Sequence, residues 1–226
     1  MSVQSPNCIK KDGLTMEEPK ETYWSKFADV YDDNVDYVVG KDVHQAIIKQ
    51  LSEERNLGEV IELGCGTGYF TKVICKNSST VIATDLSDEM LEQARIQLKE
   101  FQNVIVQKAN CESTLFPSGH FDTVFMANLI HFVENPLKTL QESCRLLKTG
   151  GLLLITSYTS YGMKRFEKIK LVIRFLRKCG RPPRYARNDY SPDELGTLVE
   201  STGFEVKEIQ LIGDKTKALY LMAIKK

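Results

Sequence analysis

The sequence predicts an α/β protein with a doubly wound, mostly parallel seven-stranded sheet and an antiparallel last strand. Short apolar runs alternate along the chain with amphipathic stretches, which is the pattern of strands joined by crossover helices. The first of these runs, residues 60–63, leads into a glycine-rich turn, as parallel strands do where they bind a nucleotide. A short turn at residues 213–215 joins the last two runs, and so short a connection favours antiparallel pairing.

The apolar runs and the helix-capping residues place the individual elements. We expect strands at residues 60–63, 80–85, 104–107, 121–127, 152–156, 204–211 and 218–224. The first helices are expected at 41–55, where apolar residues recur at helical spacing, and after Gly68. Another should begin at Ser87 as N-cap and run to residue 100, and one should begin at Asn135-Pro136 and end before residues 150–151. Ser191, Pro192 and Glu194 form a capping box for a last helix, which should end near Gly203.

The length and composition indicate one globular domain. The 226 residues carry no formal net charge and suffice for a single core. We expect a flexible tail at residues 1–20 and a domain at 21–226, in which 21–40 form a lid segment and 161–187 a basic cap insertion. No bilayer-length apolar run or signal peptide is evident, and the six cysteines include no C-x-x-C pair, which favours a reducing, cytoplasmic setting. The three histidines lack the spacing of metal ligands, so no metal is expected.

The turn after the first strand reads Glu62-Leu-Gly-Cys-Gly-Thr-Gly68, and Asp85 ends the second strand. Glycines at 64 and 66 allow a tight turn and a close approach of a ligand. The spacing is G-x-G-x-G, and Tyr69 stands where the dinucleotide fingerprint has its third glycine. The Glu62 carboxylate would repel a pyrophosphate and suits a cationic ligand. The pattern therefore predicts a nucleoside-bearing, cationic cofactor, with its ribose hydroxyls on Asp85.

This string resembles the first motif of the class I S-adenosylmethionine-dependent methyltransferases, and the resemblance extends over residues 41–226. It implies S-adenosylmethionine as cofactor and S-adenosylhomocysteine as product. In the family, the residue at the position of Asn110 often accepts a hydrogen bond from the adenine amino group. The backbone at the position of Cys111 often contacts the adenine ring, and the backbone at the position of Asn128 lies near the methionine part of the cofactor. The cofactor residues that we expect in this part of the chain are Glu62, Gly64, Cys65, Gly66, Gly68, Asp85, Leu86, Asn110, Cys111 and Asn128.

A second resemblance lies near the N-terminus, in Phe27-Ala28-x-x-Tyr31-Asp32-x-Asn34. The segment resembles the N-terminal part of the ubiquinone/menaquinone-biosynthesis and related small-molecule methyltransferases of type 11, although the asparagine spacing differs. The resemblance implies that Tyr31 covers the cofactor like a lid. The alternative is an amphipathic helix that packs its aromatic residues on the core. We expect Tyr23, Trp24 and Phe27 to shape the acceptor site.

Residues 161–187 contain ten Lys or Arg and a single acid, Glu167. Phe166, Ile169, Val172, Ile173 and Leu176 share one helical face, and we expect this face to pack on the domain so that the segment caps the acceptor site. Peripheral contact with an anionic membrane is the alternative. A nucleic-acid partner is not expected, because the fourth strand ends in Asn128-Leu-Ile-His131 and not in the Asn/Asp-Pro-Pro-aromatic motif of enzymes that methylate amino groups of nucleic acids.

The chemistry expected of such a site is in-line methyl transfer to an O, N, S or C nucleophile of a small-molecule acceptor. The protein supplies alignment and excludes water, and a base is needed only where the nucleophile carries a proton. His131 is the candidate base and Tyr158 a candidate acceptor contact. Three alternatives remain open: a lipid- or quinone-precursor methyltransferase at a membrane surface, a nicotinamide-dependent dehydrogenase, and a non-catalytic cofactor-binding partner protein. Tyr69 and Glu62 count against the dehydrogenase.

Overall fold

The computed structural model describes residues 20–181 and 188–226. The predicted tail at residues 1–20 therefore lies outside the described residues except for Lys20, which opens the first helix, and residues 182–187 of the predicted cap lie outside them as well. In the described part of the chain, seven strands form one sheet in the order β3-β2-β1-β4-β5-β7-β6. They are β1 (Gly58–Leu63), β2 (Ser78–Asp85), β3 (Val104–Lys108), β4 (Phe121–Ala127), β5 (Leu147–Thr159), β6 (Phe204–Ile212) and β7 (Lys217–Lys225).

The strand directions confirm the predicted fold class. The first five strands pair in parallel, and β7 is antiparallel to both of its neighbours, β5 and β6. The strand order reverses between β1 and β4, because the chain first builds outward through β2 and β3 and then returns to the other side of β1. Such a reversal leaves a crevice outside the carboxyl ends of the central strands.

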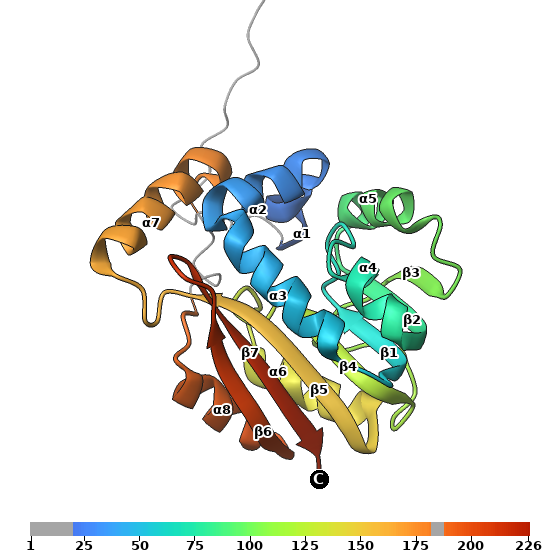
Figure 1. The fold of residues 1–226 in the computed structure, drawn as a ribbon. Helices are drawn as coiled ribbons and strands as arrows, with labels where there is room; N and C mark the ends of the chain where they lie inside the picture. Colours follow the sequence, from blue (N-terminus) through green and yellow to red (C-terminus); the bar gives the residue numbers. More distant parts are fainter. Residues whose placement is uncertain (1–19, 182–187) are drawn as a thin grey trace, which may run out of the picture.

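Helices cover both faces of the sheet (Figure 1). Successive side chains of a strand point to opposite faces, and β1 shows this: Ile61 belongs to the apolar cluster under α6 and α8, whereas Val60 belongs to the cluster under α3 and α4. A strand buried on both faces explains the continuous apolar runs of the sequence. These helices are α3 (Lys41–Glu53), α4 (Thr71–Ile74), α5 (Asp88–Leu98), α6 (Pro136–Leu146) and α8 (Pro192–Glu200).

Most element ends lie within two residues of their predicted bounds, and two differences change the local structure. The helix after Gly68 is the single turn α4, followed by the 3-10 turn η2 (Cys75–Asn77), because β2 begins at Ser78, two residues earlier than expected. Strand β5 begins directly after α6, at Leu147, and passes through the glycine pair. Gly150 has a φ of 76°, and the pairing of β5 with β4 shifts register there, so the glycines form an irregularity within the strand rather than a break before it.

Three further helices lie above the carboxyl edge of the sheet: α1 (Lys20–Ser25), α2 (Tyr31–Val39) and α7 (Arg165–Cys179), with the 3-10 turn η1 (Ala28–Val30) between the first two (Figure 1). Side-chain bonds fix the N-terminal pair to the elements below. Asp32 accepts from the Thr67 hydroxyl at 2.6 Å and from the Gln97 amide at 3.0 Å. The Tyr23 hydroxyl donates to the carbonyl of Cys179 at 2.9 Å, which joins α1 to the end of α7.

Helix α7 packs with a different face from the one predicted. The predicted face of Phe166, Ile169, Val172, Ile173 and Leu176 is 44–67% exposed. The residues that face the domain are Leu171, Phe175 and Cys179. Leu171 and Phe175 pack against the apolar cluster that contains Val60, and Cys179 is itself buried. The helix thus carries two apolar stripes. Periodicity alone favours the larger one, and the fold buries the smaller one.

Candidate functional site

The glycine turn adopts a backbone conformation that side chains with a Cβ rarely take. Gly64 and Gly66 have φ values of 71° and 54°, and a Cβ on Gly64 would lie 2.7 Å from a methyl carbon of Leu129. The Asp85 carboxylate accepts from the amides of Gly66 at 2.9 Å and Ser87 at 3.0 Å. Burial raises the pKa of Asp85, and these two amides oppose the rise. Asp85 therefore ties the end of β2 to the turn after β1.

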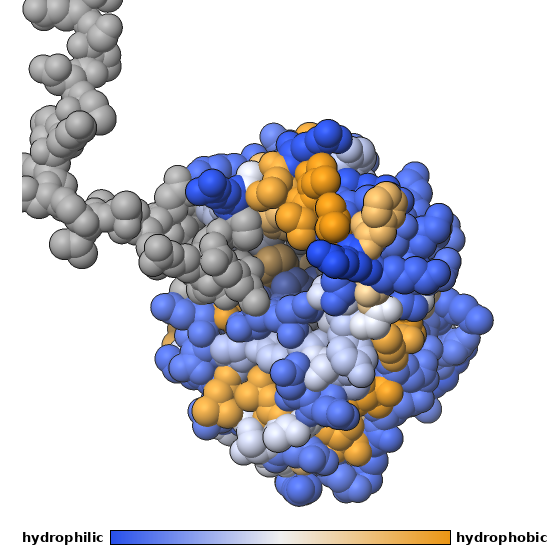
Figure 2. Space-filling view, turned by 90° about the vertical axis from the view of Figure 1, so that its left-hand side faces the viewer, coloured by the Kyte–Doolittle hydropathy of each residue, from blue (hydrophilic) through white to orange (hydrophobic). Residues whose placement is uncertain are grey.

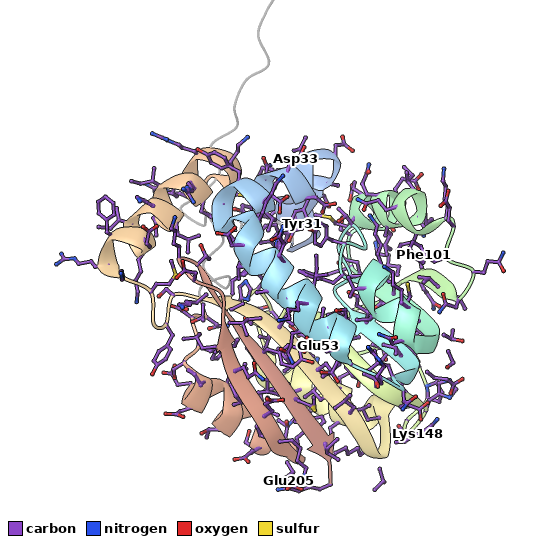
Figure 3. The ribbon with its side chains drawn as sticks, in the orientation of Figure 1. Tyr31, Asp33, Glu53, Phe101, Lys148 and Glu205 are labelled. Carbon is purple, nitrogen blue, oxygen red and sulfur yellow. The ribbon has the colours of Figure 1, made fainter. Side chains whose placement is uncertain are left out.

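A cavity of about 140 Å³ lies between this turn and the strand ends. It receives predicted residues from the N-terminal segment, the turn, and the ends of β2, β3 and β4: Trp24, Tyr31, Gly64, Gly66, Asp85, Leu86, Asn110, Cys111 and Asn128. Met90 and Val133 contribute to its apolar wall; they were not predicted, because each reads as an ordinary core residue. The Asn110 side-chain oxygen accepts from the Glu112 amide at 2.9 Å, which leaves one lone pair for a ligand. Tyr31, labelled in Figure 3, is the first residue of α2.

Glu62 is fully buried at the base of an adjoining small cavity, which Cys65 and Thr67 also line. One carboxylate oxygen accepts from the Thr71 hydroxyl at 2.6 Å. The other has no hydrogen-bond partner among the described residues. Burial raises the pKa of Glu62 to about 8. A buried carboxylate oxygen without a donor is destabilising, and an ammonium group of a ligand would satisfy it.

Gly68 has a packing role that differs from the one predicted. Its φ is 84°, and a Cβ there would lie 2.7 Å from a methyl carbon of Leu98 on α5. Gly68 is not among the residues that line the cavities described here. The third glycine of the turn therefore lets α5 approach the turn, whereas the first two face the ligand space.

A second, mostly apolar cavity of about 360 Å³ adjoins the first. Four residues line both: Trp24, Tyr31, Asn128 and Phe132. The Trp24 ring packs edge-on against Phe132 with 4.5 Å between ring centroids. His131, Tyr158 and the inner residues Leu171 and Phe175 of α7 complete much of the remaining wall. The predicted cap helix therefore forms part of this cavity, as a wall and not as a buried layer over it.

Tyr23 and Phe27, which we expected at the acceptor site, do not line either of these two cavities in the described part of the chain. The Tyr23 ring packs edge-on against Trp24 and Phe27, with centroids 4.8 and 5.7 Å away. Tyr23 therefore packs against Trp24, and Phe27 packs against Tyr23. The sequence shows an aromatic cluster but does not show which of its members faces the cavity.

His131, the predicted base, is buried in the wall of the second cavity. Its Nδ1 lies 2.8 Å from the Ser157 hydroxyl. Burial lowers the pKa of His131 to about 4. The imidazole is therefore neutral at pH 7, as a proton acceptor must be.

A second group of titratable side chains was not predicted as a group, and one of its members, Tyr158, lines the same cavity. The Tyr158 hydroxyl is hydrogen-bonded to Nε2 of His44, and Nδ1 of His44 lies 2.5 Å from an Asp36 carboxylate oxygen. Burial lowers the pKa of His44 and raises that of Tyr158. Asp36, His44 and Tyr158 come from α2, α3 and β5, so nothing in their sequence spacing brings them together.

Asn128 holds Tyr158 in place. Its side-chain oxygen accepts from the Tyr158 amide at 3.0 Å. Asn128 has a φ of 56°, a left-handed conformation that asparagine tolerates better than most residues and that is often found at functional sites. It lies directly after β4 and lines both cavities.

The comparisons with known proteins agree with this geometry. The model of a family described as "Methyltransferase domain" matches residues 61–155, the segment that carries the glycine turn, Asp85 and Asn128. A demethylmenaquinone methyltransferase from Tropheryma whipplei is 29% identical over 161 residues, which are 65% of this chain and 66% of that protein. Residues 61–155 of the chain are thus similar to a methyltransferase domain, and the fold is that of the class I methyltransferases.

Solved structures show the same methyltransferase fold. A SAM-dependent methyltransferase from Thermotoga maritima aligns with a TM-score of 0.70 at 22% identity, over 90% of this chain and 99% of that one. The cyclase SpnF also aligns, with a TM-score of 0.63 at 15% identity, over 79% of each chain. At such identities the likeness concerns the fold alone, and SpnF shows that a protein named for another reaction can share it. Among the described helices of the chain, none is long and apolar enough to cross a bilayer.

The site fits S-adenosylmethionine, the cofactor that the similarity to methyltransferase domains implies. The orphaned Glu62 oxygen suits the ammonium of S-adenosylmethionine, and Asp85 lies in the first cavity with the two glycines that permit close approach. A nicotinamide dinucleotide would instead place a pyrophosphate near the buried carboxyl group of Glu62. The dehydrogenase alternative therefore has no support in the site.

Proposed function

We propose that the chain transfers a methyl group from S-adenosylmethionine to a small, largely apolar acceptor held in the second cavity. The observation that carries this proposal is the wall shared by the two cavities. Trp24, Tyr31 and Asn128 line both, so a cofactor in one and an acceptor in the other would meet at these residues. Such adjacency supplies the alignment on which in-line transfer depends.

The residues of the first cavity and of the adjoining small cavity would bind and orient the cofactor. Asp85 would accept from the ribose hydroxyls, and Glu62, once ionised, would pair with the ammonium group. When bound, S-adenosylmethionine supplies an electrophilic methyl group on a sulfonium. Tyr31 and Trp24 would cover the reacting end and exclude water from it.

Asp36, His44 and Tyr158 form a candidate proton relay for acceptors whose nucleophile carries a proton. In the tautomer that this bonding favours, Nδ1–H of His44 donates to Asp36 and Nε2 accepts from the Tyr158 hydroxyl. The Tyr158 oxygen would accept the proton of the acceptor while its own proton passes to His44. The resulting imidazolium would be stabilised by the Asp36 carboxylate. His131 remains the alternative base, since it lines the same cavity.

Calorimetry in EDTA tests the first half of the proposal. We expect S-adenosylmethionine and S-adenosylhomocysteine to bind and NAD not to bind, because the Glu62 carboxyl lies beside the glycine turn, where a pyrophosphate would be placed. Binding of NAD in place of S-adenosylhomocysteine would contradict the proposal.

A turnover assay tests the second half, with labelled S-adenosylmethionine and a panel of apolar phenols, amines and thiols as acceptors. Label transfer to any of them would separate an enzyme from a cofactor-binding protein without methyl transfer. Tight cofactor binding with no transfer across the panel, including long-chain members, would count against an acceptor in the second cavity.

A further inference from the structure

The outer face of α7 is an exposed apolar surface on a strongly basic helix. Phe166, Ile169, Val172, Ile173 and Leu176 are each 44–67% exposed. We call these five residues the α7 patch. They appear as an apolar area bordered by hydrophilic side chains in the upper part of the molecule (Figure 2). Scattered apolar residues are common on protein surfaces, but a contiguous patch of this kind marks an interaction site.

A row of cations runs along the α7 patch. Lys170, Arg174 and Arg177 directly follow Ile169, Ile173 and Leu176 in the sequence. Because a residue is rotated by about 100° from its predecessor in a helix, these basic residues form a parallel row beside the apolar one. Glu167 is the only acid in the helix, and it is partly buried and bonded to Lys170. The patch is therefore apolar outward and basic along its side.

We propose that the α7 patch docks the protein on an anionic membrane surface, with α7 lying in the plane of the interface. An amphipathic helix with apolar residues on one side and Lys or Arg beside them is suited to this position, since the apolar side enters the acyl boundary while the cations meet anionic headgroups. A lipid surface fits the helix because its acyl chains match the apolar row and its anionic headgroups match the basic row.

Two other occupants fit the patch less well. In a symmetric dimer the same patch on both subunits would face itself, which would bring two basic rows together without acids to neutralise them. A nucleic acid would match the cations but would leave the five apolar side chains against phosphates and water. Charge and polarity together therefore favour anionic lipid.

The α7 patch also borders the second cavity. Val172 and Leu176 line this cavity and are 55% and 46% exposed, so they lie at its rim. Docking of the patch would place the rim beside the acyl chains, and an amphiphilic acceptor could enter from the lipid without crossing water. This route for the acceptor rests on the methyltransferase function proposed above, whereas the docking itself does not depend on it.

Vesicle co-sedimentation of the full chain tests the docking. We expect the protein to pellet with phosphatidylcholine vesicles that contain roughly one third phosphatidylserine, and at least about tenfold less with pure phosphatidylcholine. Raising the salt from about 0.15 M to about 0.5 M should release much of it, because the headgroup attraction is screened.

Two double variants separate the apolar and basic rows. Ile169→Glu with Ile173→Glu removes the apolar contact, and Arg174→Glu with Arg177→Glu reverses the cations; neither pair lines the cavities described above. We expect each to lower binding to the anionic vesicles by about tenfold or more. The matched controls are Ile96→Glu, an isoleucine of similar exposure on α5, and Lys49→Glu on α3, which should bind like the wild type.

Folding and cofactor affinity of every variant are checked by circular dichroism and by calorimetry with S-adenosylhomocysteine, both of which should remain at the wild-type level. The docking proposal is overturned if the wild type binds neither kind of vesicle, or if the controls lose as much binding as the patch variants. It is also overturned if the wild type is a dimer that the patch variants dissociate, since a second copy would then cover the patch. A failure of cofactor binding with intact vesicle binding would instead overturn the proposed function and leave the docking in place.

Discussion

The glycine turn after β1 borders the first cavity and helix α7 borders the second, and the two regions are held in place by different kinds of interaction. The turn is fixed by short-range requirements: two left-handed glycines, the buried Asp85 carboxylate and backbone amides within hydrogen-bond distance. Helix α7 is held by the packing of Leu171 and Phe175 and by the bond from Tyr23 to its last turn. The first region permits few alternative residues, whereas the second depends on which helical face the rest of the fold leaves free.

This difference explains which features of the site could be predicted from the sequence. The turn was predictable because spacing and residue type together specify its backbone and its charge, and Asp85 was placed by the end of an apolar run. The packed face of α7 was not predictable, since both stripes have helical periodicity and only tertiary contacts decide between them. The pairing of His44 with Asp36 and Tyr158 was missed for a related reason: their three elements meet only in the folded sheet.

The largest effect on the cofactor side is expected from Asp85→Ala. Asp85 would make two charge-assisted hydrogen bonds to ribose hydroxyls, each worth about 1.5–3 kcal/mol. We therefore expect an affinity for S-adenosylhomocysteine about 10²–10⁴-fold lower, measured by calorimetry. Asp88→Ala is the matched control, because Asp88 is exposed and pairs with Lys108 on the surface; it should bind within about twofold of wild type. Equal losses would mean that Asp85 does not face the ribose.

A comparable effect, but on turnover, is expected from Tyr158→Phe. Loss of the hydroxyl breaks the relay to His44, and a general base typically contributes about 10²–10⁴-fold. Cofactor affinity should stay near wild type, because the Tyr158 amide still donates to Asn128. Tyr161→Phe, which alters a half-exposed tyrosine just beyond β5, serves as control. If Tyr158→Phe keeps its turnover and His131→Ala loses it, the base is His131.

A smaller, pH-dependent effect is expected from Glu62→Gln. The carboxyl of the free protein has a pKa of about 8 and must ionise to pair with an ammonium group. Affinity for S-adenosylhomocysteine should therefore rise with pH below 8, by up to about tenfold per unit. Binding of the Gln variant should be weaker and nearly flat over the same range. Calorimetry in buffers of different ionisation enthalpy would show the released proton, and a flat wild-type profile would contradict the pairing.

The same carboxyl has a defined influence on stability. Because its folded pKa lies above its ordinary value of 4.5, the folded chain retains a proton that the unfolded chain loses. Its contribution to the free energy of unfolding is fully present below pH 4.5 and is lost as the pH rises through about 8. Urea titrations of the ligand-free protein should show this decline in the wild type and not in Glu62→Gln.

The smallest effects concern the two faces of α7. Phe175→Ala removes a partly buried ring that packs on the domain, and we expect the free energy of unfolding to fall by about 1–2 kcal/mol. Ile173→Ala alters the outer face, where the side chain is 44% exposed, and should change it by less than about 0.5 kcal/mol. Urea titration measures both. A larger loss at Ile173 would mean that the outer stripe is the one that stabilises the fold.

The wall between the two cavities has a consequence for how the ligands bind. Trp24 and Tyr31 contact both spaces, so a ligand that orders these rings in one cavity changes the surface offered to a ligand in the other. Thermodynamic linkage then requires reciprocity. A bound cofactor changes the affinity for the acceptor by the same factor by which a bound acceptor changes the affinity for the cofactor. Each ligand's dissociation constant therefore has a single meaning only when the occupancy of the neighbouring cavity is stated.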